Sequence, residues 1–455
     1  MNSEFFMHFV FLLFLISCNT AEHVVFSPNP TEFESRTLTN PKLQKYLESF
    51  LVADDLPSWN LDELTLAGFF FNPDLKVSQA QWNAAIAAKE TANQIPNPVL
   101  NLAPQYGGPL WALSTSLDLL FLTNNKRSFQ LAQADSQAEY ARLQILDKAW
   151  QIRAKIRNAF LGIHQSNILK AQLDQENNIL HKYKKIITEQ LNSGQISNAA
   201  ELEAKFLLAQ NELAISDAQQ KQIESSAMLA QAIGIASIQN LSINTEVFNK
   251  LPKIFQSEFA AKKETALKSR VDVLSSLATC ASTHAAYELE LAKQFPNYKL
   301  SPGYSWSKGV SKWTLGNSFE LPIFNQNLGP MHEALAKRKV AEAQFEALQV
   351  QILNEIELRI VVYNASLEKL KAANKLVEAE QNKAKLLKSR MRQGDISKTL
   401  LLRSELALQN VKITRLDALF KTQLAFVSLE DSLQAPLITN RAPLAEEVET
   451  IPSST

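Results

Sequence analysis

Two very long stretches of the chain carry apolar residues at helical spacing. Residues 127–193 and 331–393 contain no proline and only one glycine, Gly162. Their apolar side chains recur every three or four positions, which builds a stripe that packs against neighbouring helices. At 1.5 Å of rise per residue, each stretch predicts a helix roughly 95–100 Å long. The other faces are polar, so we expect these helices to lie in solvent rather than in lipid.

The same short motif ends both stretches. Gly194 and Gly394 lie 200 residues apart, and each begins the pattern Gly-x-Ile-Ser before a second apolar stripe starts. Glycine readily adopts the left-handed conformation that ends a helix, and Ser197 and Ser397 suit the N-cap of the next one. We therefore predict that each glycine marks the tip of an antiparallel helical hairpin.

Four shorter segments alternate apolar and polar residues with a period of two, which predicts strands. In residues 111–121, one set of alternate positions is mostly apolar and the other begins with Ala, Ser and Asp. Lengths near ten residues and aromatic ends are typical of tilted transmembrane strands. Each pair of segments predicts one hairpin, and the pairs are residues 100–106 with 111–121 and residues 299–306 with 313–323.

The order of helix, two strands, long helix and returning helix occurs twice, at an offset of 200 to 202 residues. Solenoid repeats are far shorter, at about 20–50 residues, so we infer a duplicated domain. The expected segments are a signal peptide (1–17), a lipid-anchor linker with an N-terminal segment (18–59), repeat 1 (60–235), a connection (236–259), repeat 2 (260–435) and a tail (436–455).

The segments outside the repeats are expected to carry little regular structure. Residues 19–41 are rich in Ser, Thr, Asn and Pro and predict an extended linker. The tail contains three prolines after residue 435 and no helical stripe, so we expect it to be flexible or to lie on the surface. The connection is expected to pack outside the helices.

The strands raise a topological problem, because four strands are too few to close a barrel and open edges cannot exist in lipid. Two arrangements satisfy the pattern: a soluble α+β domain with two small hairpins, or several chains that pool their strands. Three copies would give about twelve strands, enough to leave a lumen. Asp118 and Glu320 occupy equivalent places on the polar face. They would face the lumen of a barrel, or plain solvent in a soluble domain.

The N-terminal residues predict export. A short apolar run over residues 9–16 ends in Ser17 and Cys18, as in a secretory signal. The sequence around Cys18 also resembles a bacterial lipobox, in which Cys18 becomes the lipidated N-terminus and Asn19 favours the outer membrane. An unmodified Cys18 after a plain signal peptide is the alternative. Residues 1–8 depart from both patterns, because they contain no Lys or Arg.

Charge and motifs argue against nucleic-acid binding and against enzymatic chemistry. The 46 Lys and Arg residues balance 46 Asp and Glu residues, whereas nucleic-acid binders carry a basic excess. The sequence has no glycine-rich phosphate loop, nucleophile elbow or His-Glu-x-x-His pair. Cys280 and His284 share one helical face, but further metal ligands are missing there. We expect no enzyme, no cofactor and no metal centre, with Cys280 as a packing residue.

With these motifs in place, the chain resembles the TolC family of outer membrane efflux channels, and most closely its CzcC-type cation-efflux branch. The resemblance covers about residues 60–435 and rests on Asn72-Pro73-Asp74-Leu75, on Pro96-Asn97-Pro98-Val99-Leu100 and on residues 321–329, Leu-Pro-Ile-Phe-Asn-Gln-Asn-Leu-Gly. It implies a mainly α protein with a small β part, in which three chains share a twelve-stranded transmembrane β-barrel and an α-barrel of long hairpins.

The resemblance also implies a function and partners. The homotrimer would be a passive conduit from the outer membrane into the periplasm, where the tips dock a periplasmic adaptor (a membrane fusion protein) joined to an inner-membrane efflux pump. The branch implies export of metal cations or small toxic molecules. A secreted coiled-coil structural or adaptor protein without a pore is the alternative. It would explain the long helices but not the paired strands.

The tips depart from the family pattern. Several relatives carry acidic residues just after the second glycine, where they ring the closed entrance, but this chain has Leu400 and Arg403 there. The candidate residues for the tip and gate are Gly194, Glu201, Gly394, Asp395, Leu400 and Arg403. Two interpretations of Arg403 stay open: it pairs with an acid of a neighbouring hairpin and locks the entrance, or it is solvated.

Overall fold

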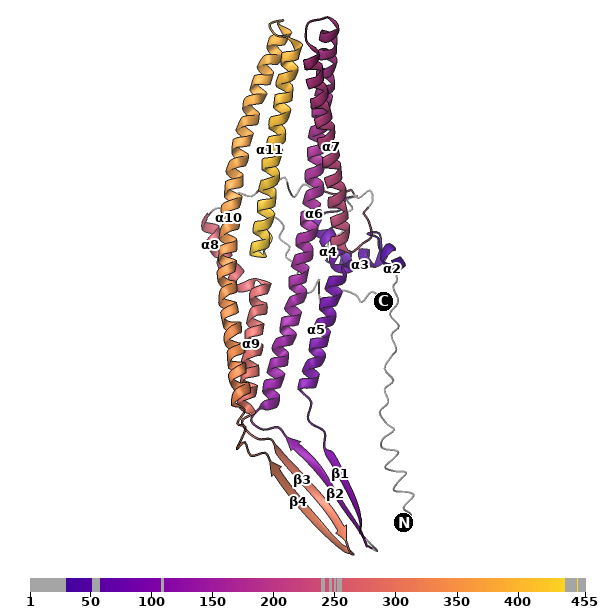
Figure 1. The fold of residues 1–455 in the computed structure, drawn as a ribbon, viewed down its shortest axis with the longest axis vertical. Coiled ribbons are helices and arrows are strands. Elements are labelled where there is room, and N and C mark those ends of the chain that lie inside the picture. The colour runs from indigo at the N-terminus through magenta and orange to yellow at the C-terminus, as the bar shows by residue number, and fades with distance from the viewer. Residues whose placement is uncertain are drawn as a thin grey trace.

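Two long helical hairpins stand side by side above a four-stranded sheet (Figure 1). The computed structural model describes residues 30–50, 58–107, 110–238, 242–244, 248, 251, 256–437 and 448. The described helices are α2 (Pro30–Glu34), α3 (Pro41–Phe50), α4 (Leu61–Phe71), α5 (Pro73–Ala92), α6 (Lys126–Asn192), α7 (Asn198–Ile233), α8 (Gln256–Ser269), α9 (Val271–Ala292), α10 (Leu328–Arg392) and α11 (Lys398–Leu433). The described strands are β1 (Val99–Gly107), β2 (Leu110–Phe121), β3 (Tyr298–Ser307) and β4 (Val310–Phe319).

The helices α6 and α10 form the two long rods of the molecule, with 67 and 65 residues and no break. This confirms the prediction from their proline-free sequences, whose bounds differ from the observed ones by a few residues. The helices α7 and α11 have 36 residues each and run back along α6 and α10 from the tips. The helices α5 and α9 cover the halves of the rods nearer the sheet, so each repeat is a long helix beside two shorter ones (Figure 1).

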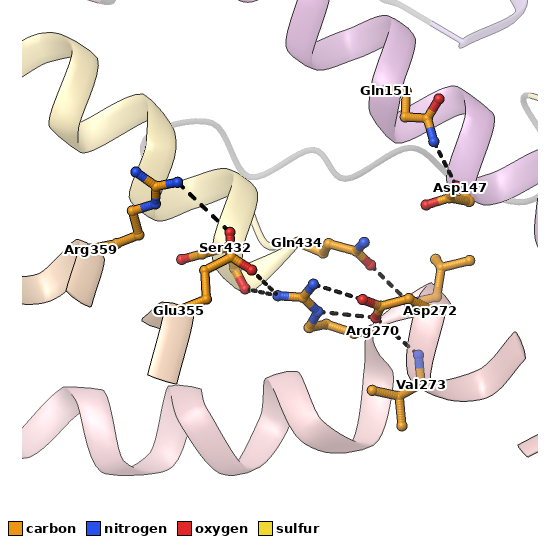
Figure 2. A network of polar contacts seen from close by, with 10 residues as sticks. Asp147, Gln151, Arg270, Asp272, Val273, Glu355, Arg359, Ser432 and Gln434 are labelled. Carbon is orange, nitrogen blue, oxygen red and sulfur yellow. Dashed lines mark hydrogen bonds and ion pairs between the residues drawn. The ribbon is translucent and has the colours of Figure 1, made fainter. Parts of the chain in front are cut away.

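Equivalent bonds join the two shorter helices in each repeat. In repeat 1, Nδ2 of Asn72, just before α5, donates to the carbonyl of Ala232 at 2.8 Å. In repeat 2, the Arg270 guanidinium, just before α9, donates to the carbonyl of Ser432 (Figure 2). The two carbonyls lie 200 residues apart at the ends of α7 and α11, so the duplication extends to the contacts that connect the two halves of each repeat.

A neighbouring bond differs between the repeats for a chemical reason. The backbone N–H of Val271 donates to Oε1 of Gln434 at 2.8 Å. The equivalent residue in repeat 1 is Pro73, which has no N–H and needs no acceptor. In repeat 1, Gly234 occupies the position that Gln434 occupies in repeat 2. The φ of Gly234 is +91°, and a Cβ added to it would lie 2.9 Å from the carbonyl oxygen of Phe71. Both residues adopt the left-handed conformation that ends a helix.

The four strands form one antiparallel sheet in the order β1-β2-β3-β4. Each repeat contributes one hairpin, and the pairing of β2 with β3 joins the hairpins of the two repeats. The predicted strands are therefore confirmed. The sequence did not predict that β2 and β3 pair with each other and so join the two repeats, for example with Thr115 opposite Tyr304. In the structure, β1 and β4 are the edge strands.

The largest hydrophobic core surrounds α4, which the sequence pattern did not single out. Nine of its eleven residues are buried, and it packs against α6 and α7. After its acidic first turn, helix α4 is almost entirely apolar, as expected for a helix buried in the middle of a structure. Its N-terminus carries a capping box in which Asn60 and Glu63 bond to each other's backbone N–H.

Three expectations for the outer segments need correction. Residues 30–34, which were expected within the extended linker of residues 19–41, form helix α2, and α3 begins at the end of that range and packs its apolar side on the core of α4. Val448 of the tail is fully buried and accepts a hydrogen bond from Gln79 at 2.7 Å, so the tail is anchored at this residue. Helix α8 begins inside the expected connection at Gln256. The signal peptide and Cys18 lie outside the described residues.

Candidate functional site

The sheet has one apolar face. Leu100, Leu102, Leu113, Trp313 and Leu315 all lie on it, by their register across the four strands. These side chains are exposed in the single chain, with exposed fractions as high as 84% for Trp313 and 67% for Leu315. An exposed apolar face of this kind requires a cover, either another protein surface or lipid.

The other face of the sheet is polar and carries every charged residue of the four strands. These residues are Asp118, Lys299 and Lys312. The register places Ser301 and Asn101 on this same face. The separation of polar and apolar residues follows the period-two alternation of the sequence, as it does in barrels that enclose water and face lipid.

Asp118 is held by three partners on the polar face. It forms an ion pair with Lys299 at 2.6 Å and accepts hydrogen bonds from Ser301 at 2.7 Å and Asn101 at 2.9 Å. The expectation of an equivalent acid at Glu320 holds only in part. Strand β4 ends at Phe319, so Glu320 lies one residue beyond the sheet. Asp118 and Glu320 are therefore equivalent by their offset of 202 residues, but Asp118 lies within a strand and Glu320 follows one.

Both hairpin tips have the same backbone geometry, at the far end of the molecule from the sheet (Figure 1). The φ angles of Gly194 and Gly394 are +72° and +83°. The N–H of the residue after each glycine bonds to a carbonyl five residues back: Gln195 to Gln190 at 2.9 Å, and Asp395 to Arg390 at 3.1 Å. This is the Schellman arrangement that satisfies the last carbonyls of a helix, and it confirms the predicted turns.

The polar groups after the two glycines differ between the tips. The Ser397 hydroxyl accepts a hydrogen bond from the Leu400 N–H at 3.2 Å, as an N-cap does. Ser197 has the extended backbone of an N-cap but makes no such bond, so the prediction was wrong for its side chain. Glu201 pairs with Lys205 on its own helix at 3.1 Å. Leu400 is exposed at the surface.

Arg403 contacts the neighbouring hairpin of its own chain, but its partner is a phenol. Its Nε donates to the hydroxyl of Tyr183 at 3.2 Å, and its guanidinium lies 5.9 Å from the centre of the Tyr183 ring. The hydroxyl of Tyr183 is the main cause that raises the pKa of Arg403. Within one chain, the hydrogen-bond partner of Arg403 is therefore a tyrosine that is buried in the core between the hairpins, and the charge of Glu203 in the first hairpin contributes to the raised pKa of Arg403.

A buried ionic cluster that the sequence pattern did not predict lies farther from the tip, between α6 and α11. Arg157 is 1% exposed, lies 2.6 Å from Glu430, and also contacts Asp431. It donates a further hydrogen bond to the carbonyl of Val427 at 3.2 Å. The signal in the sequence was a pair of arginines, Arg153 and Arg157, one turn apart within the apolar stripe of residues 149–163.

Side chains that commonly bind metals are scattered in the part of the chain that the structure describes. Among those residues, no three His, Cys, Asp or Glu side chains are placed to hold a metal ion. His284 lies 3.4 Å from Glu288, and burial raises the pKa of the half-buried Cys280 thiol. No helix in the described ranges is long and apolar enough to cross a membrane.

The comparisons with known proteins agree with this geometry. Residues 264–433, which span most of repeat 2, match the family described as outer membrane efflux protein. A search of curated proteins finds no match.

Several solved structures share the fold over most of the chain. The outer-membrane channel OprN is 17% identical, with a TM-score of 0.68 over 92% of this chain and 98% of its own. The outer membrane protein VceC from Vibrio cholerae is 17% identical, with a TM-score of 0.67 over 82% and 95%. The open MtrE outer membrane channel of Neisseria gonorrhoeae is 14% identical, with a TM-score of 0.66 over 82% and 88%.

The family match covers the second repeat, and the structural matches extend over both repeats, the sheet and the paired hairpins. Residues 264–433 thus match the family of outer membrane efflux proteins, and the chain as a whole shares the fold of the solved outer membrane channels.

Proposed function

We propose that three copies of this chain form the passive outer membrane channel of a tripartite efflux system. The observation that carries the proposal is the two-faced sheet. Its apolar face has no charged residue in the four strands, and among the described residues its edge strands β1 and β4 have a neighbour on one side only. Unpaired edges are excluded from lipid, whereas three copies joined edge to edge give a closed barrel of about twelve strands.

The helical part supports the same closure. The chain places α7 and α10 on opposite edges of its paired hairpins, with α6 and α11 between them (Figure 1). Exposed apolar side chains follow both edges: Leu202, Phe206, Leu213 and Ile223 on α7, and Val340, Val350, Leu358 and Val361 on α10. Joining α7 of one chain to α10 of the next would bury these side chains. The same three-fold assembly would thus close the sheet and the helices together.

The arrangement of the two tips supports a docking role for the end of the molecule that lies far from the sheet. Equal helix lengths bring both glycine turns to one level (Figure 1), so a trimer would present six similar tips in the periplasm. We place the docking of a periplasmic adaptor there, with an inner-membrane pump behind it. Lipidation of Cys18 would add an anchor to the outer membrane. A scaffold without a pore is disfavoured, because it gives no reason for a two-faced sheet.

The cargo is proposed from the resemblance to the CzcC-type branch, namely metal cations or small toxic molecules. Channels of this plan depend on their pump, so we place energy coupling and selection of cargo in the pump.

The assembly is tested by the mass of the detergent-purified protein, measured by light scattering with the detergent contribution subtracted. The proposal expects about three times the chain mass of 50.9 kDa, less the removed signal peptide. It also expects the trimer to aggregate when detergent is removed, because the apolar face of the sheet is then exposed. A monomer that stays soluble without detergent would overturn it.

A further inference from the structure

The charges of the strands are not spread evenly over the polar face. The three charged residues are one acid, Asp118, and two bases, Lys299 and Lys312. Their sum is +2 − 1 = +1 per chain. The acid lies near the end of β2 that leads to α6, close to the level at which a barrel would open into the helical tunnel (Figure 1).

Lys299 covers the acid. The ammonium lies 2.6 Å from Asp118, and the side chain of Asp118 is only 13% exposed while that of Lys299 is 42% exposed. Ser301 and Asn101 take up further oxygen lone pairs of the carboxylate. The group that this part of the face presents to solvent is therefore the ammonium, and the negative charge behind it is compensated.

Lys312 has a different setting on the same face. It lies in β4 opposite Ser305 and is exposed. No ion pair of Lys312 occurs among the described residues. Removing its charge would therefore leave no carboxylate uncovered, so Lys312 offers a control with the same change in net charge as Lys299.

We infer that Lys299 sets the ion selectivity of the barrel by neutralising Asp118. This inference rests on the proposed trimeric barrel, in which three such pairs form a ring around the lumen. A ring of uncovered carboxylates would concentrate cations and retain divalent ones, because charge rings in narrow pores act as ion filters. The compensated ring instead lets cargo of either sign pass without being held, as a passive conduit requires.

A structural role for the pair is the competing explanation, since Asp118 and Lys299 belong to β2 and β3, the strands that join the two repeats. The two explanations differ in the double variant Asp118→Asn with Lys299→Met. It loses the ion pair but keeps the net charge of the ring at zero. A role in selectivity predicts the wild-type ion preference in this variant, whereas a purely structural role predicts that trimer yield falls in the double variant and in Lys299→Met alike, with the ion preference unchanged in both.

The experiment is reversal-potential measurement of the purified full chain in planar bilayers under a gradient of KCl, at about 0.1 M salt to limit screening. Lys299→Met should raise the permeability ratio of K⁺ to Cl⁻ about threefold, the order expected for three partly screened charges near the pore axis. Asp118→Asn should shift it toward Cl⁻. Millimolar Mg²⁺ should reduce the current of Lys299→Met, but not that of Lys312→Met.

The outcomes separate this inference from the proposed channel. If the wild-type protein conducts and Lys299→Met keeps the wild-type permeability ratio, the inference is wrong and the channel stands. If the wild-type protein forms no trimer and no pore, the proposed function itself fails.

A labelling experiment tests the placement of Lys299 even when the tip is shut. A water-soluble thiol reagent should modify the Lys299→Cys variant of the detergent-purified trimer rapidly, and Leu300→Cys on the apolar face slowly because detergent covers it. Both rates are compared with the parent protein. Slow labelling at 299 with fast labelling at 300 would overturn the inference.

Discussion

Arg403 of the second hairpin donates a hydrogen bond to the hydroxyl of Tyr183 in the first hairpin, at 3.2 Å. The contact lies in the cluster where Leu402 and Leu406 of α11 pack against α6 near the tip. A second polar contact between the hairpins, from Thr399 to Gln190 at 3.3 Å, lies closer to the turn. These bonds fix the position of one tip relative to the other, so they are suited to hold the entrance in one conformation.

We expect Arg403→Ala to raise the channel's conductance in planar bilayers. The variant loses a hydrogen bond worth about 1 kcal/mol per chain, which changes an equilibrium between closed and open tips by about fivefold. Arg415→Ala is the matched control, because Arg415 lies on the same helix but bonds to Asn374 within its own hairpin. Unchanged conductance of Arg403→Ala in a normally assembled trimer would show that this contact does not hold the entrance closed.

Leu315→Arg should impair assembly in the membrane. Leu315 lies on the apolar face of β4 and is 67% exposed in the single chain. An arginine facing lipid near the midplane costs about 2–4 kcal/mol. Thr314→Arg, one residue away on the polar face, should assemble because its side chain can extend into water. The measurement is the yield of trimer extracted from outer membranes, and equal yields for both variants would contradict the assignment of the faces.

Arg157→Ala should lower the free energy of unfolding by about 3–5 kcal/mol, since it leaves the buried carboxylate of Glu430 without its partner. The side chains of Arg157 and Glu430 are 2% and 4% exposed. Arg338→Ala removes an exposed ion pair with Glu342 and should change the same quantity by at most about 1 kcal/mol. Denaturant unfolding in detergent provides the measurement, and losses of similar size in the two variants would refute the account of the cluster.

His164 predicts a dependence of stability on pH. Its Nε2 is buried with no hydrogen-bond partner among the described residues, and its ring packs on Phe248 at 5.6 Å between centres. Burial lowers the pKa of His164, so below its unfolded value of about 6.5 the unfolded chain binds more protons than the folded one. Stability should therefore fall as the pH drops, by at most about 1.4 kcal/mol per pH unit.

The variant His164→Phe keeps an aromatic ring against Phe248 and removes this titration. Its thermal midpoint should fall less than that of the wild-type protein between about pH 7.5 and pH 5. His284→Phe, on an exposed part of α9, is the control. If the difference between wild type and His164→Phe does not change with pH, the buried imidazole does not contribute to the acid sensitivity.

The elements that the sequence predicted are those whose patterns repeat over many residues. The rods α6 and α10 follow from long proline-free stripes, and the strands follow from alternation that places Asp118 and Lys299 on one face. The tips follow from two glycines, for which a positive φ is easily adopted. In each case a local preference and the tertiary structure agree.

The elements that it missed depend on contacts between distant segments. Helix α4 is too short and too uniformly apolar to be distinguished from a strand by its pattern alone. The contact of Arg157 with Glu430 joins residues 273 positions apart. The choice of Tyr183 as the partner of Arg403 depends on how the two hairpins pack, and neither hairpin carries that information by itself.

Three chains are expected to close into one channel. Electron-microscope imaging of the detergent-purified mature protein tests it most directly. A closed trimer should appear as a hollow cylinder with three-fold symmetry, a detergent-covered end and a helical tube on the order of 100 Å long, set by helices of about 65 residues. Single-chain particles, or filaments without a detergent-covered end, would contradict it.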